Sequence, residues 1–105
     1  MSDDIIYGTE CKLKITLPTI DDSTPYDYNF DVELYVNPKR KVVINRDFCF
    51  PVENKPSEFI VPFDTTAIGV GELNVEMVFY IPDDYFPDRL RTERRRVESI
   101  TTIIP

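Results

Sequence analysis

The chain has 105 residues, of which 42% are hydrophobic and 30% charged, enough apolar material for one folded domain with an ordinary polar surface. Its net charge of −7 argues against nucleic acid or an anionic membrane surface as a partner. No apolar run approaches the roughly 18 residues of a membrane span. The acidic start, MSDDIIYG, lacks the apolar core of a secretory signal, so we expect assembly in a cytoplasm.

The first half of the chain shows hydrophobic alternation with a period of two, which is typical of half-buried strands in an antiparallel sheet. A strand is predicted over residues 11–17 and ends at Pro18. Residues 19–25 contain Asp, Ser and Pro and predict a loop. A second strand is predicted over residues 28–36, followed by a turn at residues 37–40.

In the second half, residues 41–50 are rich in β-branched and aromatic side chains and predict a strand. A loop with two prolines is expected over residues 51–57, and a short strand over residues 58–63. Residues 64–68 favour a single helical turn, with Asp64 or Thr65 as its cap.

The last third begins with a Gly-x-Gly turn at Gly69 and Gly71. A clearly alternating strand follows over residues 72–81, and a final strand is predicted over residues 92–104. One face of the alternating strand carries Leu73, Val75, Met77, Phe79 and Ile81, and the other mostly Glu72, Asn74, Glu76 and Tyr80. No segment has a sustained helical period, and the nine prolines fall largely between the strands. The sequence therefore predicts one all-β domain over residues 1–105, an immunoglobulin-like antiparallel β-sandwich of about seven strands.

The chain lacks the most common general base and zinc ligand, and catalysis by carboxylates alone is the third and least favoured hypothesis. The sequence contains no histidine, phosphate-binding loop or CxxC pair, so we expect no enzyme, no cofactor and no metal site. Cys11 and Cys49 are interpreted as reduced thiols used as small apolar residues. Asp83, Asp84 and Asp88 share one loop, and we interpret them as turn-closing residues rather than a calcium site.

The candidate contact residues lie in the same loop and just after it. Tyr85 and Phe86 stand between acids and prolines, where aromatic side chains can anchor a partner, although Phe86 could instead cover the end of the core. Five arginines follow within eight positions and predict a basic edge on an acidic body: Arg89, Arg91, Arg94, Arg95 and Arg96. Such a run suits a solvated strand edge or ion pairs with a neighbouring subunit, and less well a phosphate group.

The late part of the chain resembles a signature of small β-sandwich virion structural proteins of Bacteroidales (crAss-like) tailed phages. That signature has the form G-x-G-x-L, a strand ending in I/L-P, and D-x-x-F-P-D-G-x-R-x-E. The matching residues are Gly69, Gly71, Leu73, Ile81, Pro82, Asp83, Phe86, Pro87, Asp88, Arg91 and Glu93. Arg89 stands where the signature has glycine.

Relatives of this kind are similar to the immunoglobulin-like attachment domain of baseplate upper proteins. The resemblance implies a non-enzymatic part of a phage particle, present in several copies and bound to capsid or fibre subunits. We expect a capsid accessory or head-fibre-associated adaptor located in the virion. The alternatives are a tail or baseplate component, or a carbohydrate- or ligand-binding module that uses Tyr80, Tyr85 and Phe86.

Overall fold

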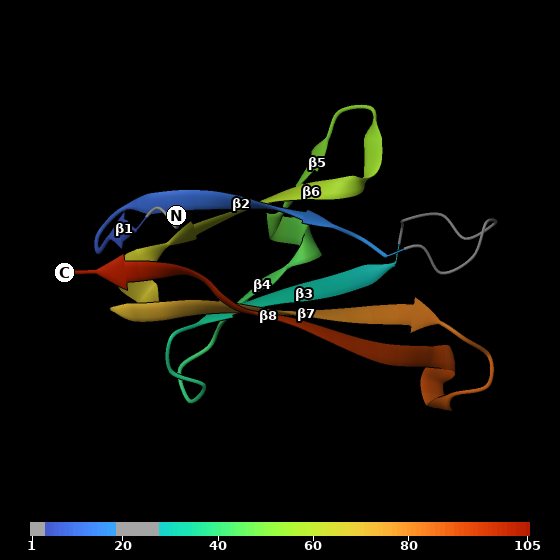
Figure 1. Cartoon of the computed structure of the whole chain (residues 1–105). Coiled ribbons are helices and arrows are strands. Elements are labelled where there is room, and N and C mark those ends of the chain that lie inside the picture. The colour runs from blue at the N-terminus through green and yellow to red at the C-terminus, as the bar shows by residue number, and fades with distance from the viewer. Residues whose placement is uncertain (1–3, 19–27) are drawn as a thin grey trace.

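Two β-sheets lie one over the other in the computed structural model, which describes residues 4–18 and 28–105 (Figure 1). One sheet has five strands in the order β1-β8-β7-β3-β4, and the other has three in the order β2-β6-β5. The strands are β1 (Ile5–Ile6), β2 (Glu10–Thr16), β3 (Asn29–Tyr35), β4 (Val42–Asn45), β5 (Phe50–Val52), β6 (Lys55–Asp64), β7 (Gly71–Pro82) and β8 (Leu90–Ile104). The predicted immunoglobulin-like β-sandwich is confirmed, and no α-helix occurs in the described residues.

The strand pairing is antiparallel with a single exception among the described strands. The short strand β1 runs parallel to the end of β8, where Ile5 lies opposite Ile103. This contact brings the two terminal strands together at one end of the sandwich, as Figure 1 shows. Within the apolar end of the chain, Ile103 is fully buried and Ile104 is partly buried.

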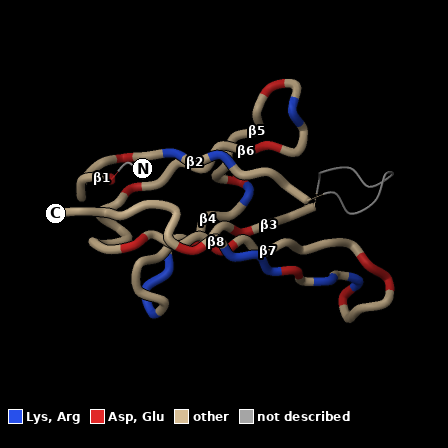
Figure 2. The backbone as a smooth tube through the Cα atoms, in the orientation of Figure 1, with Lys and Arg blue, Asp and Glu red and all other residues tan. Residues whose placement is uncertain are grey.

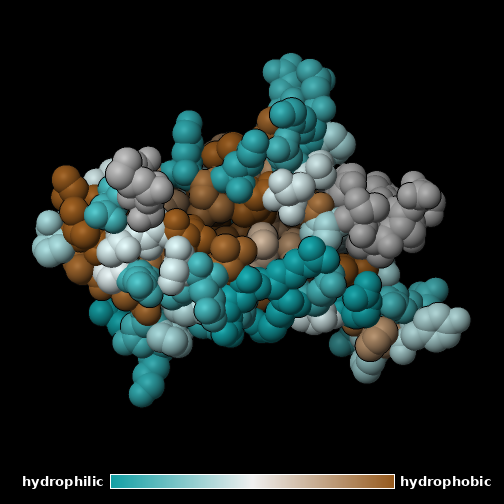
Figure 3. Space-filling view, viewed as in Figure 1, coloured by the Kyte–Doolittle hydropathy of each residue, from teal (hydrophilic) through white to brown (hydrophobic). Residues whose placement is uncertain are grey.

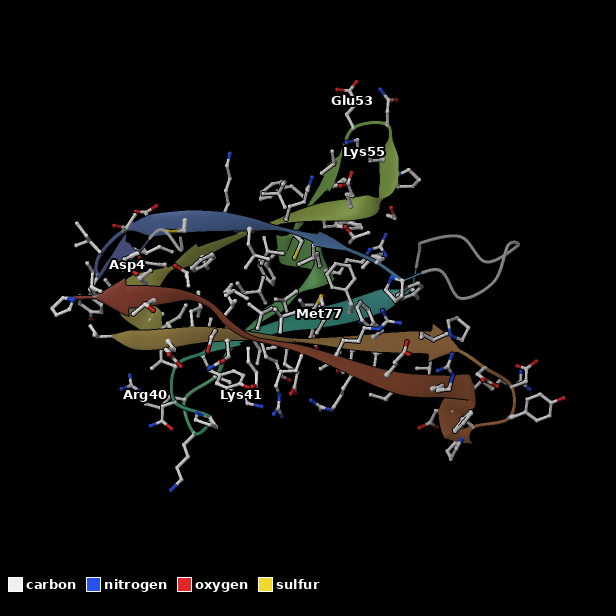
Figure 4. All side chains as sticks on the ribbon, in the orientation of Figure 1. Asp4, Arg40, Lys41, Glu53, Lys55 and Met77 are labelled. Atoms are coloured by element: carbon white, nitrogen blue, oxygen red, sulfur yellow. The ribbon has the colours of Figure 1, made fainter. Side chains whose placement is uncertain are left out.

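The core lies between the sheets and is built from the alternating apolar faces of the central strands. Strand β7 places Leu73, Val75, Phe79 and Ile81 there, all of them buried, so the inward face predicted for this strand is confirmed. Figure 4 shows Met77 between the two sheets and Lys41 on the opposite side of the five-stranded sheet. That outer side carries the polar side chains discussed below.

The sequence-based description of residues 41–57 is wrong in two respects. The single strand expected over 41–50 is divided by the 3-10 turn η1 (Arg46–Phe48), and the expected proline-rich loop is a hairpin between β5 and β6. The hairpin forms because Asn54 adopts a positive φ of 64° in the two-residue turn. Pro51 is tolerated because β5 is an edge strand, and Pro56 because it lies beside a register shift.

The predicted capping and glycine features are confirmed. Asp64 caps the 3-10 turn η2 (Thr65–Ala67), its carboxylate accepting a hydrogen bond of 2.9 Å from the Thr66 N–H. Gly69 and Gly71 have φ values of 110° and 138°, which glycine adopts most readily. The loop predicted over residues 19–25 lies outside the described residues. Cys11 and Cys49 are free thiols, as expected.

Candidate interaction surface

The loop between β7 and β8 is organised around one aspartate. The Asp83 carboxylate accepts a hydrogen bond of 3.0 Å from the Tyr85 N–H, and its other oxygen lies 3.4 Å from Arg91 Nε. The Asp83 N–H donates to the Arg89 carbonyl over 2.9 Å, and the Asp83 carbonyl accepts from the Phe86 N–H. The turn-closing role predicted for these acids is therefore confirmed for Asp83, which holds the loop at both ends.

The aromatic residues of this loop face solvent. Tyr85 is 96% exposed, and Phe86 is 45% exposed, so Phe86 does not cover the end of the core as one interpretation allowed. Figure 1 shows that the loop projects beyond the body of the sandwich. A tyrosine whose side chain is exposed on a hydrogen-bonded loop is a suitable contact residue, because the loop backbone is already ordered and loses little conformational entropy on binding.

Alternation along β8 divides the arginine run between two sides of the sheet. Arg94 and Arg96 lie opposite Val78 and Glu76 on β7, so both face outward. Arg91 and Arg95 point to the other side, toward the edge of the core. Arg89 precedes the strand in the 3-10 turn η3 (Pro87–Arg89), and its side chain makes no ion pair with the described residues. The seven candidate residues therefore do not form one continuous surface.

The outward arginines bind a buried carboxylate in their own chain. Glu76 is only 5% exposed and accepts hydrogen bonds from Arg94 (2.6 Å) and Arg96 (3.2 Å). Lys41 Nζ lies 3.7 Å from the same carboxylate and 3.2 Å from Glu33. Acidic and basic residues consequently lie side by side on β7 and β8 (Figure 2), and much of the predicted basic edge is neutralised within the chain.

The charge state of Glu76 follows from two opposing effects. Burial disfavours the carboxylate and is the largest single influence on it. The hydrogen bonds from Arg94 and Arg96, with the charge of Lys41, outweigh that influence and hold the pKa of Glu76 below its usual range. The sequence placed Glu76 on the outward face of β7, but it gave no sign that long arginine side chains would bury it.

A second polar cluster lies on the same outer side. The Tyr80 hydroxyl donates to Asp31 over 2.7 Å, which raises the pKa of Tyr80, and Asn45 donates to the other Asp31 oxygen over 2.8 Å. Tyr80 and Asp31 also line an open cavity of about 550 Å³. Tyr85 and Phe86, both of them described, do not line it, so the three aromatics considered for ligand stacking are not assembled there.

Two other types of site were searched for in the described residues. Residues 4–18 and 28–105 hold no cluster of three or more acidic or cysteine side chains suited to a metal ion. Within the same residues, no helix has the length and apolar character required to cross a membrane. Of the three loop aspartates, Asp83 takes part in a turn and in an ion pair.

Comparison of the chain with protein-family models, with curated proteins and with solved structures finds no match.

Proposed function

We propose that this chain is a non-enzymatic structural protein of a tailed-phage particle, a capsid accessory or head-fibre-associated adaptor that binds other virion proteins in several copies. The observation that carries the proposal is the loop held by Asp83, which presents a 96% exposed Tyr85 on a rigid β-sandwich. A module with this design contributes by docking, because a fixed loop lets an aromatic anchor bind at low entropic cost.

The late sequence signature supports the placement in a phage particle, and the loop geometry agrees with it at one point. Arg89 replaces the glycine of the signature, yet its φ is 57°, the left-handed conformation that glycine favours. The turn implied by the resemblance is thus present despite the substitution. A tail or baseplate position would use the same loop and remains the alternative within this class.

The contact residues in this proposal are Tyr85, Phe86 and Arg89, with Arg91 beside them through its ion pair with Asp83. Arg95 lies farther along β8, opposite Met77, and is not part of this contact. Arg94 and Arg96 are assigned a mainly structural role, because both are hydrogen-bonded to Glu76. Replacing these two arginines would disturb the sheet as well as any interface, so they are unsuited to a test of docking.

The test is mass spectrometry of purified phage particles, applied to the wild-type chain and to one double variant of the loop. We expect the wild-type chain in particles, and Tyr85→Ala with Arg89→Glu to reduce its incorporation while circular dichroism and thermal unfolding stay unchanged. Phe48→Ala is a matched control, since Phe48 is 71% exposed but belongs to η1, outside the β7–β8 loop. A protein abundant in infected cells and missing from particles would refute the virion assignment. Normal incorporation of the double variant would refute the loop as its contact.

A further inference from the structure

An apolar groove opens between the two sheets on one side of the sandwich. Its cavity of about 280 Å³ lies where the edge of β2 faces β8 across the end of the core. Figure 3 shows hydrophobic side chains uncovered between the two layers, with hydrophilic side chains above and below them. The apolar lining comes from three strands: Leu13, Ile15, Val75, Met77, Val97 and Ile100.

Burial along β7 shows that the core is incomplete at this point. Val75 and Phe79 are 4% and 0% exposed, yet Met77, midway between them on the same face of a central strand, is only half-buried. Val97 is 47% exposed and Ile100 is 37% exposed. A central inward position is normally the best covered in a β-sandwich, so the cover missing over Met77 marks a place for further side chains.

Both walls of the groove are open strand edges in the described residues. Strand β2 pairs with β6 on one side and has no described partner on the other. Strand β8 pairs with β1 only at Ile103 and Ile104, so within the described residues no strand covers this edge of β8 from Leu90 to Thr102. An open edge presents unpaired N–H and C=O groups, which an added strand can satisfy.

The two open strands are basic in an acidic protein. Strands β2 and β8 together carry six Lys or Arg and three Glu, whereas the whole chain has 12 and 19. Lys12 and Lys14 project from the outer face of β2, and Arg95 lies on the side of β8 that faces the groove. Lys14 is paired with Glu58 and Arg95 with Glu93. Lys12 makes no ion pair within the described residues, so its ammonium group is the charge of β2 that can attract an acidic residue of an added strand.

We propose that this groove binds an extended segment of a partner protein in which apolar and acidic residues alternate. The segment pairs with the open edge of β2 and extends the three-stranded sheet to four strands. Its apolar side chains cover Met77 and Val97, and an acidic side chain lies beside Lys12. A period of two is required because successive side chains of a strand point to opposite faces.

A second copy of this chain is the less suitable occupant. Its open strands β2 and β8 carry the same basic excess, so pairing them edge to edge would place like charges opposite each other. The groove is also separate from Tyr85 and Arg89, so this inference goes beyond the docking loop. Its test requires no phage particle and can fail or succeed independently of the proposed function.

The test uses the full chain and a short peptide in which Ile and Glu alternate, with binding measured by calorimetry. We expect binding by this peptide, and at least about tenfold weaker binding by a peptide with the Ile residues grouped at one end or with Lys in place of Glu. In the complex, hydrogen exchange should slow at amides of β2 and stay unchanged at the edge strands β4 and β5.

Substitutions at two similarly exposed valines test whether the peptide binds in the groove. Val97→Asp places a carboxylate in the groove and should weaken binding by about tenfold or more. Val43→Asp should have no effect, because Val43 is 56% exposed on the outer side of β4. The proposal is overturned if the alternating peptide does not bind, if the Lys peptide binds equally well, or if protection appears on β4 or β5. It is also overturned if sedimentation shows a dimer that Val97→Asp dissociates, which would make the occupant a second copy.

Discussion

Arg94 Nη1 lies 2.6 Å from Glu76 Oε2, across the β7–β8 pairing, and this contact assigns Arg94, one of the five clustered arginines, to the fold. Arg96 binds the other carboxylate oxygen, so Glu76 is held between two guanidinium groups on the outer side of the sheet. A carboxylate this well buried requires such partners, because an unpaired buried charge is strongly unfavourable.

Glu76→Gln should lower the free energy of unfolding by about 1–3 kcal/mol, since it removes the negative charge and one acceptor oxygen of the group that accepts three hydrogen bonds from Arg94 and Arg96. Urea unfolding followed by circular dichroism measures this difference. Glu98→Gln is the matched control. Glu98 contacts the same Arg96 at 3.6 Å but is 71% exposed, so its loss should cost under about 0.5 kcal/mol. Equal effects of the two variants would contradict the role given to Glu76.

Acid should destabilise the protein through the same carboxylate. The pKa of Glu76 is lower in the folded chain than the value of about 4.3 expected in the unfolded chain. Its contribution is therefore fully present above the unfolded pKa and is lost as the pH falls through the folded pKa. The pKa values of two other carboxylates are lowered as well, because Lys14 hydrogen-bonds Glu58 and Thr66 hydrogen-bonds Asp64. Their contributions to stability are therefore also lost as the pH falls.

Urea midpoints measured between about pH 5 and about pH 3 should thus fall for the wild-type chain and fall less steeply for Glu76→Gln. The difference between the two proteins should shrink toward the acid end of this range. A constant difference over the whole range would mean that Glu76 acts through packing rather than through its charge.

Arg89→Gly should stabilise the protein by about 0.5–1 kcal/mol. Arg89 has a φ of 57°, in the left-handed region that disfavours side chains with a Cβ, and glycine removes that strain although it adds freedom to the unfolded chain. Arg91→Gly is the control, because Arg91 lies in regular strand and loses its contact to Asp83, so it should destabilise. Thermal unfolding of the two variants tests the sign of each stability change. A melting temperature of Arg89→Gly below that of the wild-type chain would contradict the prediction.

The sequence was sufficient for the fold class because the apolar and polar faces of the strands alternate clearly. Phe30, Val32 and Leu34 of β3 are all fully buried, as a period of two predicts for one face. The expected loop at residues 51–57 failed because two prolines outweighed a hairpin signal that rests on Asn54 alone. Proline excludes a central strand much more strongly than an edge strand, and edge position is not visible in a sequence.

The candidate interaction surface was only partly predictable, because the pairing and register of the strands are not visible in a sequence. Alternation along β8 could have separated Arg94 and Arg96 from Arg95 in advance, because adjacent strand residues face opposite sides. It could not have identified Glu76 as their partner, since the register of β7 against β8 sets that pairing. The groove likewise depends on which strands end up at the sheet edges.

Gly71→Ala should be among the most damaging single substitutions in this chain. A Cβ at Gly71 would lie 2.5 Å from Val36 Cγ1, and the φ of 138° is already unfavourable for alanine. We expect a loss of about 3 kcal/mol or more, from strain and overpacking together. Gly69→Ala separates the two causes. Gly69 has a φ of 110°, but a Cβ there would meet no atom within 4 Å. Gly69→Ala should therefore lower the free energy of unfolding by the backbone strain alone, about 1–2 kcal/mol.

Val36→Ala completes the comparison, because it removes the methyl groups that a Cβ at Gly71 would meet. In a double-mutant cycle, Gly71→Ala should be less damaging in the Val36→Ala background by about 1 kcal/mol or more, with the strain remaining. Gly69→Ala should show no such coupling to Val36. If Gly71→Ala costs the same in both backgrounds, the close approach to Val36 does not limit the size of this residue, and backbone conformation alone accounts for the glycine.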